Sequence, residues 1–217
     1  MLSKTQLMTM LQLQGDMNKK INVNWLSADW DFSMAIMMEA NEAIEHHGWK
    51  WWKKQLPDTP QLQMELVDIW HFMLSKLLVE HNGNASVTAN YIIADRANLH
   101  RHVLLDNTVT YPLQETLLQN LRAISGLAAV GRISLLTFFT AVQYSGLSEE
   151  ELFVQYVGKN VLNNFRQDNG YKEGTYTKVW GGYEDNEHLV ELLAGLDPLS
   201  PNYIENLRDE LSDSYPG

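Results

Sequence analysis

Two pairs of carboxylates lie in two stretches of the chain that have helical periodicity, and within each pair the residues are three positions apart. The first pair is Glu39 and Glu42, and the second is Glu65 and Asp68. Residues three apart project from the same face of a helix, so antiparallel packing of the two helices would bring four acidic side chains together. Two like charges about 4 Å apart repel by roughly 4 kcal/mol at an effective dielectric constant near 20. A hard divalent cation removes that repulsion, and oxygen ligands favour Mg²⁺, with Mn²⁺ as a substitute.

Both pairs lie beside apolar stripes rather than within wholly polar segments. A solvated acidic face, or ion pairs on the helix surface, would explain a single pair. Two pairs on apolar helices favour a metal site instead, because burying an uncompensated charge costs several kcal/mol. His71 follows Asp68 by three residues, and we interpret it as a hydrogen-bonded core histidine rather than a ligand.

Helical periodicity dominates the sequence and strand alternation is nearly absent, which predicts an all-α fold. We expect a helical bundle whose antiparallel core helices carry the ExxE and ExxD pairs, forming a single domain over residues 1–217, with room for a mobile sub-region. Capping boxes are expected at Ser3 with Gln6 and at Ser148 with Glu151. The expected helices run from Ser3 to about Lys20, Asp29 to His47, Pro60 to His81, in two or three pieces from Ala85 to Ser145, and from Ser148 to Asp168, with two short helices opened by Asp185 and by Ser200 and Pro201. Loops are expected around Asp106 to Pro112 and from Tyr171 to Tyr183.

Composition excludes several classes of protein. The net charge is −11, which disfavours non-specific binding to nucleic acid or to an anionic membrane. The chain has no Cys, so disulfides, thiolate metal sites and a Cys nucleophile are excluded. The most apolar stretch, residues 121–142, is interrupted by two Arg residues, which favours a buried helix pair over a membrane span. We expect a cytoplasmic protein that binds neither nucleic acid nor membranes.

A basic and amide-bearing face is expected on the helix that follows Ser148. Lys159, Asn163 and Arg166 are spaced by four and three residues and lead into a loop that contains Tyr171 and Lys172. Arg can bind two phosphate oxygens at once and Lys supplies a point charge, so this pattern suits a chain of phosphates. A polar outer face is the alternative.

Two further sets of residues are candidates for binding an aromatic base. Gln14 and Asn18 continue the apolar face of the first helix, and paired amides offer the donors and acceptors that read a base edge. The alternative is a helix end bonded to water. Trp49 opens a run of aromatic and cationic residues that could stack on a base or pack beneath its own loop.

Four segments resemble the dimeric, all-α dUTPase family, which belongs to the helical nucleoside-triphosphate pyrophosphohydrolases together with MazG-type enzymes and phage dCTPase-dUTPases. The segments are EANE, GWKWWK, ELVDIWHF and KNVLNNFRQDNGYKEGTY. The resemblance covers residues 7–82 and 130–190, whereas residues 83–129 carry no family motif. Gly15 stands where some relatives carry Gln, so base contacts could differ in detail.

The resemblance implies a role for each group of candidate residues. Two or three Mg²⁺ ions would be bound by Glu39, Glu42, Glu65 and Asp68. Gln14 and Asn18 would recognise uracil, with Trp49 at the base pocket. The sugar and phosphates would be held by Lys159, Asn163, Arg166, Tyr171 and Lys172.

The expected activity is therefore Mg²⁺-dependent hydrolysis of dUTP, and also of dUDP, to dUMP, with release of pyrophosphate from dUTP. Lys159, Arg166 and Lys172 would stabilise the transferring charge, and either Glu39 or Glu42 would act as general base. We expect a homodimer, as in the family. The alternatives are a pyrophosphohydrolase for dCTP or another pyrimidine nucleotide, a helical di-iron carboxylate protein, and a non-catalytic interaction protein.

Overall fold

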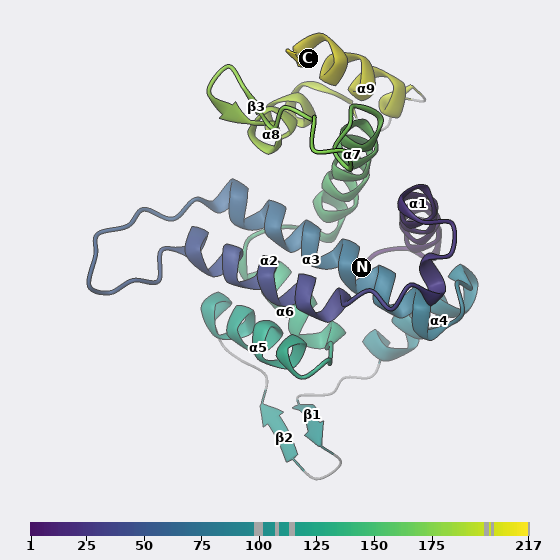
Figure 1. Cartoon of the computed structure of the whole chain (residues 1–217). Coiled ribbons are helices and arrows are strands. Elements are labelled where there is room, and N and C mark those ends of the chain that lie inside the picture. Colours follow the sequence, from purple (N-terminus) through teal and green to yellow (C-terminus); the bar gives the residue numbers. More distant parts are fainter. Residues whose placement is uncertain (98–101, 107–108, 113–115, 198–199, 201, 217) are drawn as a thin grey trace.

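The computed structural model describes residues 1–97, 102–106, 109–112, 116–197, 200 and 202–216. Within these residues the chain is predominantly helical, which confirms the predicted all-α class (Figure 1). The helices are α1 (Lys4–Ile21), α2 (Phe32–His47), α3 (Thr59–Glu80), α4 (Ala85–Ala97), α5 (Leu117–Ala129), α6 (Leu135–Tyr144), α7 (Glu149–Asp168), α8 (Asp185–Gly195) and α9 (Tyr203–Ser214), with a short 3₁₀ turn at Trp25–Ser27. Two antiparallel hairpins complete the described structure, β1 (His102–Asp106) with β2 (Val109–Pro112) and β3 (Val179–Trp180) with β4 (Tyr183–Glu184).

Helices α2 and α3 form an antiparallel pair at the centre of the molecule (Figure 1). Helix α5 packs against α2, and α6 packs against α5. Helices α1 and α7 contact α3. Helix α3 is buried along most of its length because its apolar residues surround it almost completely, which is typical of a central helix.

Local capping signals account for the ends of these helices. The predicted capping boxes at Ser3 and Ser148 are both present. Helix α2 begins at Phe32 rather than at the predicted Asp29, because Asp29 has a left-handed φ of 51° and the side chain of Asp31 instead accepts a hydrogen bond from the N–H of Met34. Gly48 ends α2 in the left-handed conformation, with φ 75°.

The two segments predicted as loops contain short strands. Of the expected loop around residues 106–112, the described parts pair in the β1–β2 hairpin, and residues 107–108 lie outside the described residues. The expected loop from Tyr171 to Tyr183 includes β3 and the start of β4, joined by two glycines with positive φ. Strands this short leave almost no alternating pattern for the sequence to reveal. Pro201, expected to open the last helix, lies outside the described residues, and α9 begins at Tyr203.

Helices α8 and α9 lie beside α7, on the far side of the α2–α3 pair from the β1–β2 hairpin (Figure 1). Gly158 allows α8 to approach α7 closely, because a Cβ atom at this position would lie 2.6 Å from a methyl carbon of Leu193. Aromatic rings join the segments on this side: Tyr176 stacks on Tyr215 with 5.3 Å between ring centroids, and both rings contact Phe165 of α7. None of the described helices is long and apolar enough to cross a membrane.

Candidate active site

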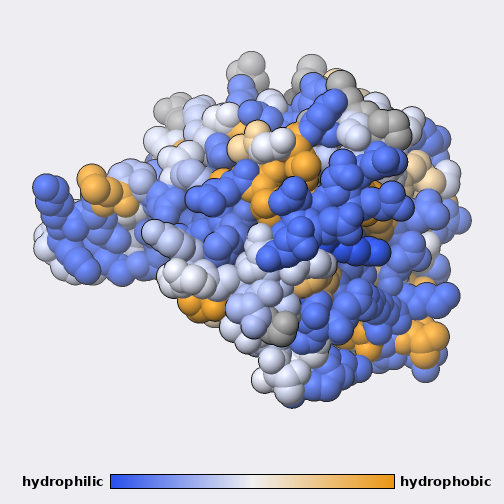
Figure 2. All heavy atoms as spheres, turned by 90° about the horizontal axis from the view of Figure 1, so that it is seen from above, coloured by the Kyte–Doolittle hydropathy of each residue, from blue (hydrophilic) through white to orange (hydrophobic). Residues whose placement is uncertain are grey.

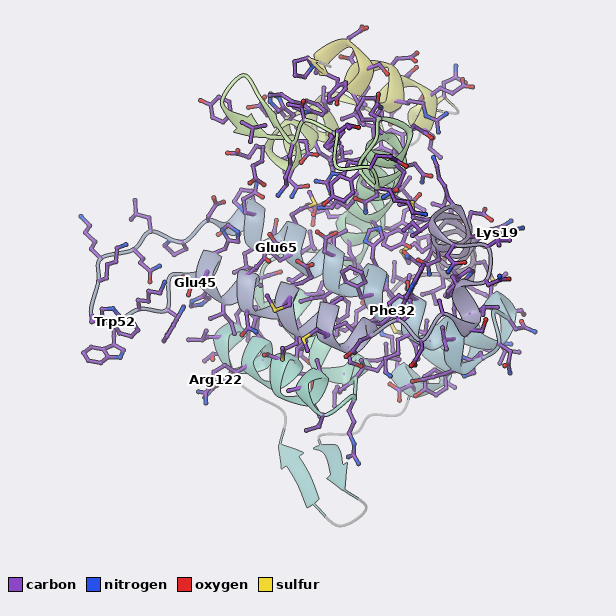
Figure 3. The ribbon with its side chains drawn as sticks, in the orientation of Figure 1. Lys19, Phe32, Glu45, Trp52, Glu65 and Arg122 are labelled. Carbon is purple, nitrogen blue, oxygen red and sulfur yellow. The ribbon has the colours of Figure 1, made fainter. Side chains whose placement is uncertain are left out.

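Three of the four predicted metal-binding carboxylates form a cluster between α2 and α3. One carboxylate oxygen from each of Glu39, Glu42 and Glu65 lies within 4.8 Å of the others. Glu65 is buried, Glu39 is half-buried and Glu42 is exposed. Glu65 is labelled in Figure 3, on the part of α3 that runs beside α2. The i,i+3 spacing and the antiparallel pairing therefore bring the three side chains together as expected.

The cluster holds more negative charge than its surroundings can compensate. Burial, then the neighbouring charges of Asp68 and Glu42, raise the pKa of Glu39 to about 7. Burial and the charge of Asp68 raise the pKa of Glu65 to about 9. A carboxyl group with a raised pKa retains its proton unless a cation stabilises the charged form. Hard oxygen donors, close spacing and excess negative charge all fit a divalent cation of the Mg²⁺ type.

Asp68, the fourth predicted ligand, pairs with a cation supplied by the protein itself. Lys159 Nζ lies 2.7 Å from Asp68 Oδ2 and donates a hydrogen bond of 2.8 Å to Asn186 Oδ1. The Lys159 side chain is buried although it is charged. Asp68 is the second-largest influence on the pKa of both Glu39 and Glu65, so it lies close to the cluster while its own charge is balanced by Lys159.

Arg166 is held by residues from the start of α8. Its Nε and Nη2 each donate a hydrogen bond of 2.7 Å to Asp185, which is fully buried. Arg166 also donates to Asn163 at 3.0 Å and to Asn186 at 3.1 Å. Burial by itself would raise the pKa of Asp185, but the hydrogen bonds and charge of Arg166 hold it below the usual value. The guanidinium group is therefore fixed in place before any ligand binds.

The carboxylates and the basic residues line one cavity of about 600 Å³. This is a typical size for a small-molecule site. Its lining includes acidic side chains of α2 and α3, together with Lys159, Arg166 and Tyr171 from α7 and the segment that follows it. The remaining residues that line it are His46, Asp58, Gln61, Lys178, Glu184, Asn186 and Glu187. A cavity that holds both cation-binding oxygens and fixed positive charges suits a ligand that is itself a polyanion chelating a divalent metal.

A comparison with protein families identifies the family to which a chain with this site belongs. The family model described as dUTPase matches residues 6–171 of the chain. The protein belongs to the dUTPase family. Among curated proteins, none matches the chain. The family match includes residues 83–129, for which sequence motifs alone showed no resemblance, and it ends before α8.

As a dUTPase, this enzyme hydrolyses dUTP and is a dUTP diphosphatase. Its substrate is a nucleotide whose three phosphates carry several negative charges, in agreement with the charge pattern of the cavity. The clustered glutamates agree with the metal dependence expected of the family.

The predicted base-reading pair of the dUTPase lies within the protein rather than along this cavity. Gln14 and Asn18 are each 4% exposed, and Gln14 Nε2 donates a hydrogen bond of 3.1 Å to Asn18 Oδ1. Lys172 is exposed and donates to the carbonyl of Ile21, which ties the segment after α7 to the end of α1. Asn163 accepts a hydrogen bond from Arg166, and the guanidinium of Arg166 lies over the ring of Tyr171. Tyr171 also lines the cavity.

Trp49 lies apart from the other predicted residues of the dUTPase site. It belongs to the loop between α2 and α3, is partly exposed, and donates a hydrogen bond of 2.8 Å to Glu45. The loop stands out from the body of the molecule in the space-filling view (Figure 2). In Figure 3, Trp52 of this loop and Lys19 of α1 lie on opposite sides of the molecule. Within one chain, the structure does not bring Trp49 to Gln14 and Asn18.

Sequence reasoning missed the contribution of α8 to the site. Helix α8 does begin at Asp185, as predicted, but the sequence does not show that the Asp185 carboxylate holds Arg166. Asn186 bonds both Lys159 and Arg166, and Tyr176 donates a hydrogen bond of 2.8 Å to Asp185. No spacing rule links these residues to α7, because the intervening segment is irregular. His71 agrees with its predicted role as a core residue, since its Nδ1 bonds the carbonyl of Val67 at 2.9 Å.

Proposed function

We propose that this dUTPase hydrolyses dUTP, and also dUDP, with Mg²⁺ at the α2–α3 carboxylates, and that dUTP yields dUMP and pyrophosphate. One observation carries the proposal: three undercompensated glutamates and two fixed cations, Lys159 and Arg166, line the same cavity. The raised pKa values of Glu39 and Glu65 support the binding of a cation at the cluster, because they reflect negative charge that the protein leaves uncompensated there. Lys159 and Arg166, which line the same cavity, support a ligand that carries negative charge.

The metal would be held by Glu39, Glu42 and Glu65, with Asp68 as the fourth ligand. When bound, Mg²⁺ would neutralise phosphate charge and make a water molecule a better nucleophile. Glu39 or Glu42 would accept the proton that the attacking water loses. Mn²⁺ offers similar charge and ligand preference and should substitute.

Lys159 and Arg166 would bind the phosphates and stabilise the charge that moves to the leaving group. Both side chains are already fixed by Asp68, Asp185 and Asn186, so little reorganisation is needed when substrate arrives. Asn163, Tyr171 and Lys172 would complete the binding of sugar and phosphate.

Gln14 and Asn18 would select uracil. Uracil presents two carbonyl acceptors around an N–H donor, whereas cytosine replaces one carbonyl with an amino donor. A mismatched buried polar group costs about 1–3 kcal/mol. We therefore expect dUTP to be preferred over dCTP by at least about tenfold, since 1.4 kcal/mol corresponds to a factor of ten.

We also propose that residues 1–217 act as one domain, because Asp185 and Asn186, which lie beyond the family match, hold the cations of the site. The resemblance to dimeric relatives supports a homodimer, and light scattering coupled to size-exclusion chromatography would measure its mass. A cysteine-free chain suits the reducing cytoplasm.

The test is a panel of dUTP, dUDP, dCTP and dTTP, incubated with Mg²⁺, with Mn²⁺ or with a chelator. We expect dUMP and pyrophosphate from dUTP with either metal, and no turnover with the chelator. Glu42→Gln should lose turnover, whereas Glu205→Gln on the exposed side of α9 should retain it. Orthophosphate as the first product from dUTP would contradict the proposed bond cleavage. Equal rates with dUTP and dCTP would contradict the proposed base selection and favour a dual-substrate enzyme.

A further inference from the structure

The two amides proposed to read the base are part of a buried chain of hydrogen bonds that links α1, α3 and α7. Asn18 Nδ2 donates to Ser75 Oγ at 3.0 Å, and Gln14 Nε2 donates to Asn18 Oδ1 at 3.1 Å. Tyr156 donates its O–H to Gln14 Oε1 at 2.8 Å. Ser75 and Tyr156 are both completely buried and do not line the cavity that holds the carboxylates.

The chain of bonds has a fixed direction, which starts from a backbone carbonyl. Ser75 has a single hydroxyl proton and donates it to the carbonyl of His71 at 3.0 Å. Its oxygen can then only accept, so the side of Asn18 that faces Ser75 must be the NH₂ group. The Asn18 carbonyl consequently faces Gln14, and the NH₂ group of Gln14 must face that carbonyl. The Gln14 carbonyl is left to accept from Tyr156, whose single hydroxyl proton also has a second acceptor within reach, the carbonyl of Met10 at 3.0 Å.

Neither amide can therefore turn alone, and turning both together would require Ser75 and Tyr156 to redirect their protons, to Asn18 and to the carbonyl of Met10. Turning Asn18 by 180° would place an oxygen against the Ser75 oxygen and an NH₂ group against the NH₂ group of Gln14. Burial raises the pKa of Tyr156 well above its usual value, so the phenol keeps its proton and remains a donor. The amides are nearly inaccessible, so water cannot easily replace a lost partner.

The fixed orientation matters because an amide that can turn does not discriminate between bases. An NH₂ group aimed at a base oxygen favours uracil, whereas a carbonyl in the same place would favour the amino group of cytosine. Each amide uses only one of its two N–H bonds within the chain and has a further N–H for a ligand.

We propose that Ser75 and Tyr156 are positioning residues that determine the base specificity of this dUTPase by fixing the orientation of Asn18 and Gln14. The inference rests on the proposed recognition of uracil by that pair. Neither residue need touch the substrate, because each acts through an amide.

The experiment compares Ser75→Ala and Tyr156→Phe with the unaltered enzyme, using the ratio of kcat/KM for dUTP to kcat/KM for dCTP. This ratio does not depend on the fraction of enzyme that is folded, so a merely structural role would leave it unchanged. We expect each variant to lower the ratio by about fivefold or more, which is the effect of losing roughly one buried hydrogen bond. If Ser75→Ala folds poorly, Tyr156→Phe provides the same test.

Ser145→Ala is the matched control. Ser145 is also buried and donates its hydroxyl proton to a backbone carbonyl, that of Val142 at 2.7 Å, but it has no bond to either amide. We expect this variant to keep the dUTP to dCTP ratio of the unaltered enzyme. An equal fall in the ratio for Ser145→Ala would overturn the proposal.

Asn18→Ala separates this inference from the proposed function. If Asn18→Ala lowers the ratio and Ser75→Ala does not, base recognition by Asn18 stands and the positioning role of Ser75 is wrong. If Asn18→Ala leaves the ratio unchanged, recognition by Asn18 is itself wrong, and the positioning role falls with it. If Ser75 acts through Asn18, the variant carrying both changes should have the same ratio as Asn18→Ala alone. A further fall in the double variant would overturn the proposed route.

Discussion

The ammonium group of Lys159 lies 2.7 Å from the carboxylate of Asp68, and the two residues come from helices α7 and α3. Sequence motifs assign Asp68 to the metal and Lys159 to the phosphates, yet the folded chain pairs them with each other. Lys159 therefore balances one of the four acidic side chains, whereas among the described residues no Lys or Arg forms an ion pair with the three clustered glutamates, and Glu65 has only the imidazole of His46 at 3.6 Å. The position of Lys159 links the metal site to the phosphate site.

The first prediction concerns Lys159. Lys159→Ala should lower kcat for dUTP by about 100-fold, a loss typical of removing one group that stabilises transition-state charge. The substitution also leaves Asp68 without its cation, so the temperature of unfolding should change as well. Steady-state kinetics with saturating Mg²⁺ measures the effect. Lys53→Ala, on the exposed loop between α2 and α3, is the control and should have little effect. Similar small losses in both variants would contradict a role for Lys159 in turnover.

The second prediction concerns the pH dependence of stability without metal. The folded-state pKa values of Glu39 and Glu65 are raised to about 7 and about 9, so the folded protein holds protons that the unfolded chain releases. The stability associated with these protons is present at low pH and is lost as pH rises through those values. In a chelator, the temperature of unfolding should fall between pH 6 and pH 9 by at least about 2 °C.

Added Mg²⁺ should raise the temperature of unfolding more at pH 9 than at pH 6, because the metal binds the deprotonated carboxylates. Glu65→Gln should flatten the dependence measured in chelator and weaken the response to Mg²⁺. Glu205→Gln, exposed on α9, is the control and should retain both effects. Stability that rises with pH over this range in chelator would show that the cluster is compensated by other means.

The third prediction concerns the buried pair of Arg166 and Asp185. Asp185→Asn keeps the shape of the side chain but leaves the guanidinium without its counter-charge, and breaking a buried pair in this way costs about 3–5 kcal/mol. The free energy of unfolding, measured by urea denaturation, should fall by that amount. The KM for dUTP should also rise, because Arg166 loses its fixed position. Asp209→Asn, an exposed substitution on α9, should leave both quantities nearly unchanged. No loss of stability in Asp185→Asn would show that the pair is not formed in solution.

The fourth prediction concerns the close packing of α7 and α8. In Gly158→Ala the new Cβ would lie 2.6 Å from a methyl carbon of Leu193, so the Leu193 side chain must move and the packing between α7 and α8 is disturbed. Overpacking of this kind costs about 1–3 kcal/mol, and a displacement of α8 would move Asp185 and Asn186 away from the cations they hold. Calorimetry and kinetics should therefore show losses of both stability and turnover.

Two controls test this explanation. Leu193→Ala added to Gly158→Ala should restore part of both losses, because it removes the obstructing methyl groups. Gly126→Ala places a Cβ in open space on α5 and should stabilise the protein by up to about 1 kcal/mol, as expected for alanine in a helix. A gain of stability in Gly158→Ala would mean that α8 does not rest on this glycine.

Short-range patterns in the sequence were sufficient to predict the helices and the carboxylate cluster. The capping boxes at Ser3 and Ser148 and the left-handed Gly48 involve contacts within a few residues, so composition and spacing reveal them. Residues three apart on an apolar helix must share a face, and the short connection between α2 and α3 made their antiparallel pairing the natural expectation. The start of α2 was misjudged because both Asp29 and Asp31 can cap a helix, and only the backbone conformation of Asp29 decided between them.

The partners of the functional side chains were decided by the tertiary structure alone. The contacts that hold these side chains join different helices. They are the ion pair of Lys159 with Asp68, the ion pair of Arg166 with Asp185, and the hydrogen bonds that link Ser75 and Tyr156 to the two amides. Such contacts depend on how helices rotate and how closely they approach, as at Gly158, and no local spacing encodes those quantities. The sequence by itself determined which residue types were available on each helix face. The packing of α7 and α8 against the central α2–α3 pair determined which of these side chains contact one another. The physical reason is that a buried charged or polar group is stable only when it has a partner within the fold.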